Sequence, residues 1–260
     1  MNNNATKTST KITQSRLAGS TWYIHLLLWV VVIFMMFPIL YAMLTSTQSN
    51  AEMFRLQMTP GDHFGINLKA VLDRDIVLLL FNTFVVAGMI TVGKVVLSLF
   101  GGMALVYFRF PGKNLVFILI LSALMIPGEV TIIALYRLVV MDLGWGNTWT
   151  AIVVPALATP TGLFLFRQHF AGITPELCEA AQLDGATPLQ FLFRILLPIS
   201  KATVAALVTI MFISGWNNYL WPSLVITDPK KQVIQVGLSS LDAGLAVSYT
   251  HLTLPTSVTV

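Results

Sequence analysis

The sequence has few charged residues, and this shortage limits the kind of protein it can be. Asp, Glu, Lys and Arg make up 10% of its 260 residues, whereas 56% are hydrophobic and the mean hydropathy is +0.79. Soluble globular domains carry about 25% charged residues. The composition therefore excludes an ordinary water-soluble domain and predicts a protein that is embedded in lipid.

Residue clusters that support chemistry are also missing. The single cysteine, Cys178, permits no internal disulfide and is interpreted as a small inert hydrophobe. The net charge is +4, but the basic residues form no run or stripe, so we expect no nucleic-acid partner. No His, Asp or Glu group has metal-ligand spacing and no nucleophile has a base beside it. The sequence thus predicts a non-catalytic chain that binds no metal or cofactor.

One string imitates a nucleotide-binding loop. Gly88 to Lys94 spells G-x-x-x-x-G-K, but Val95 follows where a magnesium-binding Ser or Thr is needed, and the string lies in a continuous apolar stretch. Its glycines are interpreted as sites of close helix packing. The chain is therefore expected to hydrolyse no nucleotide itself.

Long apolar stretches are what the sequence does have. A helix needs roughly 20 apolar residues to cross about 30 Å of hydrocarbon. The first stretch is longer than the apolar core of a cleavable signal peptide, so we interpret it as an uncleaved anchor. The sequence predicts an all-α, polytopic transmembrane helix bundle with five spans: Trp22–Leu44, about Asn82–Tyr107, about Asn114–Val140 interrupted at Pro127-Gly128, about Thr148–Phe166, and about Ala202–Ile226.

Orientation follows from the distribution of charge between the spans. With the N-terminal tail, residues 1–21, in the cytosol, the inside segments hold eight basic and three acidic residues, against six basic and eight acidic ones outside. Lys and Arg are enriched in cytosolic loops. The counts favour a cytosolic N-terminus, although the margin in basic residues alone is small.

The loop between the fourth and fifth predicted spans, Arg167–Lys201, carries strong local signals. Thr174 is a plausible N-cap, with Pro175 at the first helical position, and Asp184-Gly185 would end that helix. Thr187 and Gln190 have the spacing of a capping box for a second helix, which Pro198 would stop or kink. The pattern predicts a cytosolic helix-turn-helix that meets a partner protein. An amphipathic hairpin lying on the membrane is the alternative.

The same loop resembles a known family. Glu179-Ala180-Ala181, then Gly185 after three residues, then Ile195, Leu197 and Pro198 after nine more match the EAA loop of binding-protein-dependent ABC importer permeases. FRFPGKNL at 108–115, FLFRQHF at 164–170 and SGWNNYLWP at 214–222 extend the resemblance, which covers about residues 22–242. These segments are most similar to the carbohydrate-uptake branch, and within it to the second permease subunit of glycerol-3-phosphate importers.

The resemblance implies a function and a set of partners. It implies a bacterial inner-membrane permease subunit that pairs with a homologous second permease, two cytosolic ATPase subunits and a periplasmic solute-binding protein. ATP and magnesium would be bound by the ATPase, and the solute would be sn-glycerol 3-phosphate, a related polyol phosphate or a sugar. Contact with the ATPase would lie at Glu179, Ala180, Ala181, Asp184, Gly185, Ile195, Leu197 and Pro198.

The resemblance also bears on the domain boundaries. Permeases of this type have a sixth span, which is not seen here. We therefore expect a permease domain over residues 22–244, with its coupling loop at 167–201, and a truncated or foreign tail at 245–260. A secondary transporter is the rival class; it would need ion-coupling carboxylates inside the spans and usually internal repeats, and neither is seen.

Polar residues inside the predicted spans are the candidates for the solute path. Lys94 lies mid-span, where a charge costs about 2.5–3.5 kcal/mol; it either has a structural role or lines the path. Glu129, beside the break in the third span, is either at the outer mouth or an interfacial carboxylate. Trp216, Asn217 and Asn218 could bind a polyol, although Asn side chains more often join helices.

Overall fold

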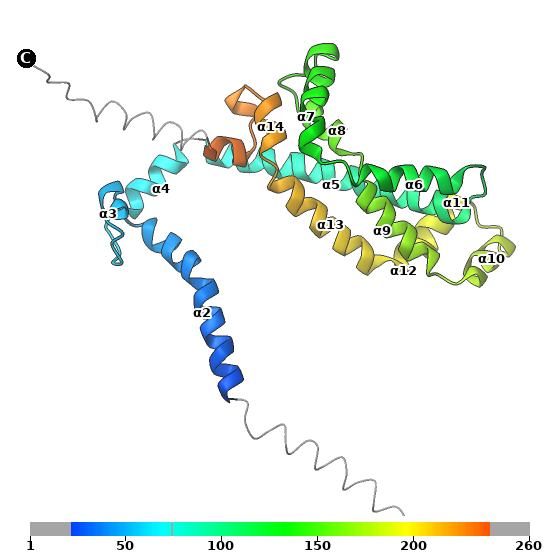
Figure 1. Cartoon of the computed structure of the whole chain (residues 1–260), viewed down its shortest axis with the longest axis horizontal. Coiled ribbons are helices and arrows are strands. Elements are labelled where there is room, and N and C mark those ends of the chain that lie inside the picture. The colour runs from blue at the N-terminus through cyan, green and yellow to red at the C-terminus, as the bar shows by residue number, and fades with distance from the viewer. Residues whose placement is uncertain (1–21, 74, 240–260) are drawn as a thin grey trace, which may run out of the picture. The chain divides into compact units, whose positions relative to one another are not determined.

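The computed structural model describes residues 22–73 and 75–239, which form helices and connecting turns without a strand (Figure 1). The chain divides into two compact units, 1–74 and 75–260. The first contains α2 (Trp22–Thr45), α3 (Asn50–Phe54) and α4 (Phe64–Leu72). The second contains α5 (Ile76–Tyr107), α6 (Lys113–Ala123), α7 (Gly128–Tyr136), η1 (Arg137–Asp142), α8 (Trp149–Ala156), α9 (Pro160–Ala171), α10 (Pro175–Leu183), α11 (Pro188–Phe191), η2 (Leu192–Leu196), α12 (Leu197–Ile199), α13 (Lys201–Trp216), α14 (Leu220–Val225) and η3 (Pro229–Lys231).

Helix α2 confirms the first predicted span. It has 24 residues, so at 1.5 Å per residue it is long enough to cross the hydrocarbon core of a membrane. None of its residues is buried within the first unit. A helix that is apolar on all sides and unburied needs lipid or another protein around it.

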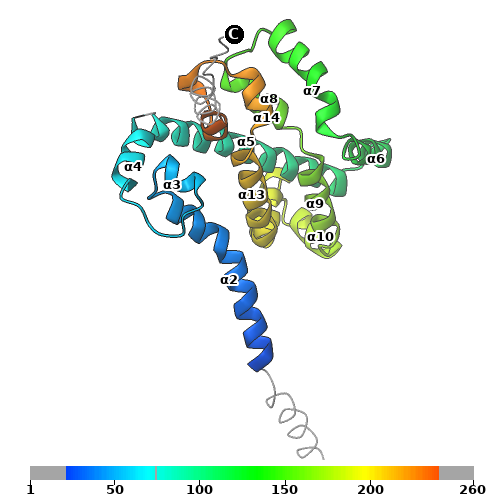
Figure 2. The same cartoon turned by 60° about the vertical axis from the view of Figure 1, so that its left-hand side comes forward.

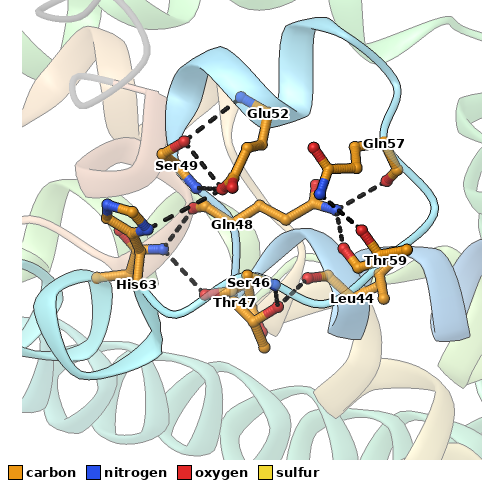
Figure 3. Close-up of polar contacts among 11 residues, drawn as sticks. Leu44, Ser46, Thr47, Gln48, Ser49, Glu52, Gln57, Thr59 and His63 are labelled. Atoms are coloured by element: carbon orange, nitrogen blue, oxygen red, sulfur yellow. Dashed lines mark hydrogen bonds and ion pairs between the residues drawn. The ribbon is translucent and has the colours of Figure 1, made fainter.

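A compact polar turn follows α2 (Figure 3). The side chain of Gln48, 3% exposed, donates from Nε2 to the carbonyl oxygens of Gln57 and Thr59, at 2.7 Å each. Ser49 and Glu52 form a capping box at the start of α3, in which the Glu52 carboxylate accepts hydrogen bonds from the Ser49 N–H and hydroxyl. These bonds fix the loop 46–63 without a hydrophobic core.

The Glu52 carboxylate should make this turn sensitive to acid. The hydrogen bonds from the Ser49 N–H and hydroxyl lower the pKa of Glu52, with smaller contributions from His63 and Arg55. A carboxyl whose pKa is lower in the folded state stabilises that state above its unfolded pKa, and the contribution is lost as pH falls through the folded pKa. The protection factors of the amides of residues 49–54 against hydrogen exchange should therefore fall below about pH 4. Glu52→Gln, which keeps a capping-box acceptor, should remove this pH dependence; equal dependence in both proteins would contradict the assignment.

The second unit is built around α5, which runs unbroken for 32 residues. At one end α5 shares a core with α9, α10, α11, η2 and α13; its buried members include Leu99, Met103, Phe166, Phe170 and Leu207. Towards its other end α5 shares a separate core with η1, α8, α14 and the segment after η3, including Ile90, Val139, Ile152 and Trp221. We call these the inner core and the outer core.

The helices around α5 are shorter or broken. Within the described residues, α2, α5 and the stretch Trp149–Ala171 are long and apolar enough to cross a membrane, and a fourth span results if Pro188–Ile199 and Lys201–Trp216, bent by 83°, form one broken span. The expected third span consists of α6 and α7, which are separated at 124–127, so the predicted interruption is present. The expected fifth span also differs: α13 ends at Trp216, and the short α14 follows after Asn217–Tyr219.

The second predicted span begins earlier than expected. Helix α5 starts at Ile76 rather than at Asn82. Asn82 is 2% exposed and its side chain donates to the carbonyl oxygens of Lys230 and Gln232, at 2.9 and 3.0 Å. Because these bonds satisfy the amide, a polar residue that looked like a helix boundary lies inside the helix.

Candidate functional site

The segment between α9 and α13 folds as its capping residues predict. Helix α10 begins after Thr174 with Pro175 at its first position, although the Thr174 side chain makes no capping hydrogen bond. The second helix begins with the complete capping box that was expected, in which Thr187 and Gln190 each accept a hydrogen bond from the other's backbone N–H. Figure 1 and Figure 2 both show α10 beside α9 at the inner-core end of α5.

The end of α10 explains the spacing of the sequence motif. The Ala186 N–H donates to the Ala181 carbonyl and the Gly185 N–H donates to the Gln182 carbonyl. This pair of hydrogen bonds defines a Schellman cap. Gly185 has φ +72°, the left-handed conformation this cap requires and glycine adopts without strain. Ala181, 5% exposed, packs into the inner core. The interval from Ala181 to Gly185 is therefore the length of one helix cap.

The opposite face of α10 is left uncovered. Glu176, Glu179, Ala180 and Leu183 follow the i, i+3, i+4, i+7 spacing of one helix face, and all four are exposed. Leu183 is 90% exposed. Asp184, the C-cap residue, is also exposed at the same end. The result is an apolar tip with carboxylates around it, held rigidly on the side away from the inner core.

The second helix of the segment returns the chain to the spans. Phe191, Leu192 and Leu196 are buried in the inner core, whereas Ile195 and Leu197 are half-buried against it and Pro198 is exposed. The chain then turns by 83° at Ser200 into α13. Pro198 provides no N–H for the helix, which continues through it and ends at Ile199.

Comparison with known proteins agrees with this geometry. Residues 94–260 match the family described as the inner membrane component of binding-protein-dependent transport systems. The chain belongs to this family. Curated relatives include sn-glycerol-3-phosphate transport system permease proteins UgpE of Rhizobium meliloti (40% identity; 88% of this chain and 86% of the relative) and of Pectobacterium atrosepticum (39%; 86% and 83%).

A solved structure shows the same fold for this permease. A chain of a bacterial ABC transporter involved in the import of the acidic polysaccharide alginate superimposes with a TM-score of 0.70 at 24% identity, over 90% of this chain and 86% of the other. Together with the family and the apolar helices, this confirms an all-α, multi-pass inner-membrane permease. The permease is thus a transport component. Among the described residues no three His, Cys, Asp or Glu side chains form a metal-binding group.

The candidate path residues do not converge in the described structure. Lys94 is half-buried on the packed side of α5, one turn from Thr91 and Ser98, with no hydrogen bond or ion pair within the described residues. Trp216 ends α13, where Gly215 lies against Ala87, two turns from Lys94. Glu129 lies in the first turn of α7.

Asn217 and Asn218 differ in the hydrogen bonds that they make. The Asn217 side chain donates to the Ile213 carbonyl at 3.0 Å and accepts from Gln235 at 3.3 Å. Asn217 is the C-cap residue of α13, and the bond from Gln235 ties it to the segment after η3. Asn218 is half-buried, and its backbone N–H donates to the Gly215 carbonyl. The predicted 245–260 tail lies outside the described residues.

Sequence reasoning missed a polar junction at the outer core. Asn147, at φ +61°, accepts hydrogen bonds on its side-chain oxygen from the N–H groups of Thr227 and Asp228. The Trp221 indole donates to the Ala151 carbonyl at 2.8 Å, and the Trp149 indole donates to the Lys231 carbonyl at 3.1 Å. With Asn82, these residues hold the segment after α14 against α5 and α8. Isolated Asn and Trp side chains give no recognisable spacing in the sequence.

Asn82 should be a key residue for this junction. Asn82→Leu keeps the side-chain size but leaves two carbonyl oxygens without their donor, which should cost about 1–3 kcal/mol. We expect faster tryptic cleavage after Lys230 and Lys231 in the purified protein, by about five-fold or more. Asn114→Leu, at an exposed position in α6, is the control. Equal cleavage rates in the two variants would show that Asn82 does not hold the segment.

Proposed function

We propose that this permease belongs to an ATP-driven importer of sn-glycerol 3-phosphate or a related polyol phosphate. The proposal is supported by the UgpE relatives at 39–40% identity and by the candidate coupling segment. A sugar is the second candidate solute. The half-buried ammonium of Lys94, which has no anionic partner within the described residues, favours the phosphate, since an anionic solute would supply that partner.

The uncovered face of α10 is the proposed contact surface for the ATPase. Its apolar tip and surrounding carboxylates suit an apolar cleft with a basic rim on a cytosolic ATPase. Glu179, Ala180, Asp184 and Gly185 would contact the ATPase directly. Ala181, Ile195, Leu197 and Pro198 would instead transmit the force, because they join the helix to the inner core or set the turn into α13.

The complete importer contains further subunits. In this proposal the chain pairs with a homologous second permease, rests on two ATPase subunits that bind ATP and magnesium, and receives solute from a periplasmic binding protein. The N-terminus and the α9–α13 segment lie in the cytosol. Closure of the ATPase dimer moves α10 as a rigid body, and the spans then alternate between inward- and outward-facing arrangements.

Reconstitution of the importer tests the proposal. The chain, its co-encoded permease, ATPase and binding protein are placed in liposomes with ATP inside. We expect accumulation of radiolabelled sn-glycerol 3-phosphate that requires ATP and the binding protein and is competed by the unlabelled solute but not by maltose. If maltose alone competed for uptake, a sugar would replace sn-glycerol 3-phosphate as the proposed solute. Uptake without any ATPase, driven by an ion gradient, would overturn the function.

A further inference from the structure

A crevice lies between α10 and α5, and Glu179, at the edge of the uncovered face, lies at its mouth. It consists of two adjoining hollows at the inner-core end of α5, and Tyr107, Cys178 and Gln182 line both of them. One end is a cavity of about 100 Å³ with mainly apolar walls, which include Met103, Ala186 and Phe191. The other end opens at Arg109, Lys113 and Glu179. We call this space the α5–α10 crevice.

The crevice lies at the depth of lipid headgroups. The span α5 ends at Tyr107 and the span Trp149–Ala171 ends at Ala171, and both of these terminal residues line it. Where two spans end, the hydrocarbon core gives way to the interface. This position holds whichever way the chain is oriented in the membrane.

The charges at the open end favour an anion. Arg109 is exposed and makes no hydrogen bond or ion pair within the described residues. Lys113 donates to the carbonyl oxygens of Val106 and Phe108, at 3.2 and 3.3 Å, so it caps α5 and adds positive charge there. These two cations outnumber the single carboxylate of Glu179. An apolar cavity with a cationic rim matches an acyl chain joined to a phosphate group.

We propose that the α5–α10 crevice binds an anionic phospholipid of the surrounding leaflet, with its phosphate at Arg109 and part of an acyl chain in the apolar end. The bound lipid fills the space between α5 and the inward face of α10 and fixes the distance of α10 from the spans. Its effect on ATPase coupling rests on the proposed function, whereas the binding itself does not.

The only thiol of the chain reports on the crevice. Cys178 is half-buried and lines both ends, so an occupant should shield it from a small thiol reagent. The complete complex is placed in nanodiscs of phosphatidylcholine with increasing phosphatidylglycerol, and the rate of Cys178 alkylation by N-ethylmaleimide is followed by mass spectrometry of this chain. We expect phosphatidylglycerol to slow the reaction several-fold in the wild type.

Two variants and one control decide the outcome. Arg109→Gln should raise the phosphatidylglycerol content needed for half-protection about five-fold, whereas Arg137→Gln, exposed and outside the crevice, should not. Ala186→Phe, which fills the apolar end, should slow alkylation in phosphatidylcholine alone. An alkylation rate indifferent to phosphatidylglycerol, or equal protection in Arg109→Gln and Arg137→Gln, would overturn the proposal. No solute or nucleotide is needed, so this result is independent of the transport assay.

Discussion

Gly185→Arg is expected to lower coupled uptake strongly while the permease still inserts and assembles. A Cβ at Gly185 meets no atom within 4 Å, so the arginine can be accommodated within this chain. Its bulk and charge would instead project beside Leu183 and Asp184, at the uncovered end of α10. We expect uptake to fall more than ten-fold, with ATP hydrolysis no longer stimulated by the loaded binding protein.

Backbone strain must be separated from lost docking in this experiment. An arginine at φ +72° costs about 1 kcal/mol. Gly112 provides a matched control, because it has φ +76° and also has no atom within 4 Å of an added Cβ. Gly112→Arg should show the same small loss of thermal stability with near-normal uptake. Gly185→Asn, which tolerates the left-handed conformation, should also remain active. Normal uptake by Gly185→Arg would contradict the docking role.

Lys94→Met should lower uptake about ten-fold or more without loss of assembly. A hydrogen bond to a charged group contributes about 1.5–3 kcal/mol, and methionine keeps the length of the side chain without its charge. Since Lys94 makes no polar contact within the described residues, its removal leaves no described partner unsatisfied. Solute-dependent uptake rates and the yield of intact complex are the two measurements.

The rival interpretation of Lys94 predicts a different result. A structural lysine would lower complex yield in Lys94→Met while the transport rate per complex stayed constant. Lys94→Arg keeps the positive charge and should recover part of the uptake. Val96→Met, at an exposed position on the same helix, controls for a changed lipid contact. Unchanged uptake kinetics in Lys94→Met would remove Lys94 from the path.

The coupling segment was predictable because its signals are local. The capping box of Thr187 and Gln190, the left-handed Gly185 and the turn just after Pro198 each depend on residues within a few positions. The break at 157–159 carries a similar signal, because Thr159 caps α9 and Pro160 is its first residue, but averaged hydropathy hides it. The break at 217–219 is hidden by the same averaging. Asn82 shows the same limit: its partners Lys230 and Gln232 lie about 150 residues away, so the sequence made it look like the start of a helix.

The unbroken α5 acts as a lever between two separately packed ends. At 1.5 Å per residue its 32 residues measure about 48 Å, so a tilt of about 5° about one end displaces the other by about 4 Å. The inner core ties one end to α10, and the outer core ties the other to the Asn147 junction. In the proposed function, an ångström-sized displacement of α10 by the ATPase would in this way reach the outer core without any helix having to unwind.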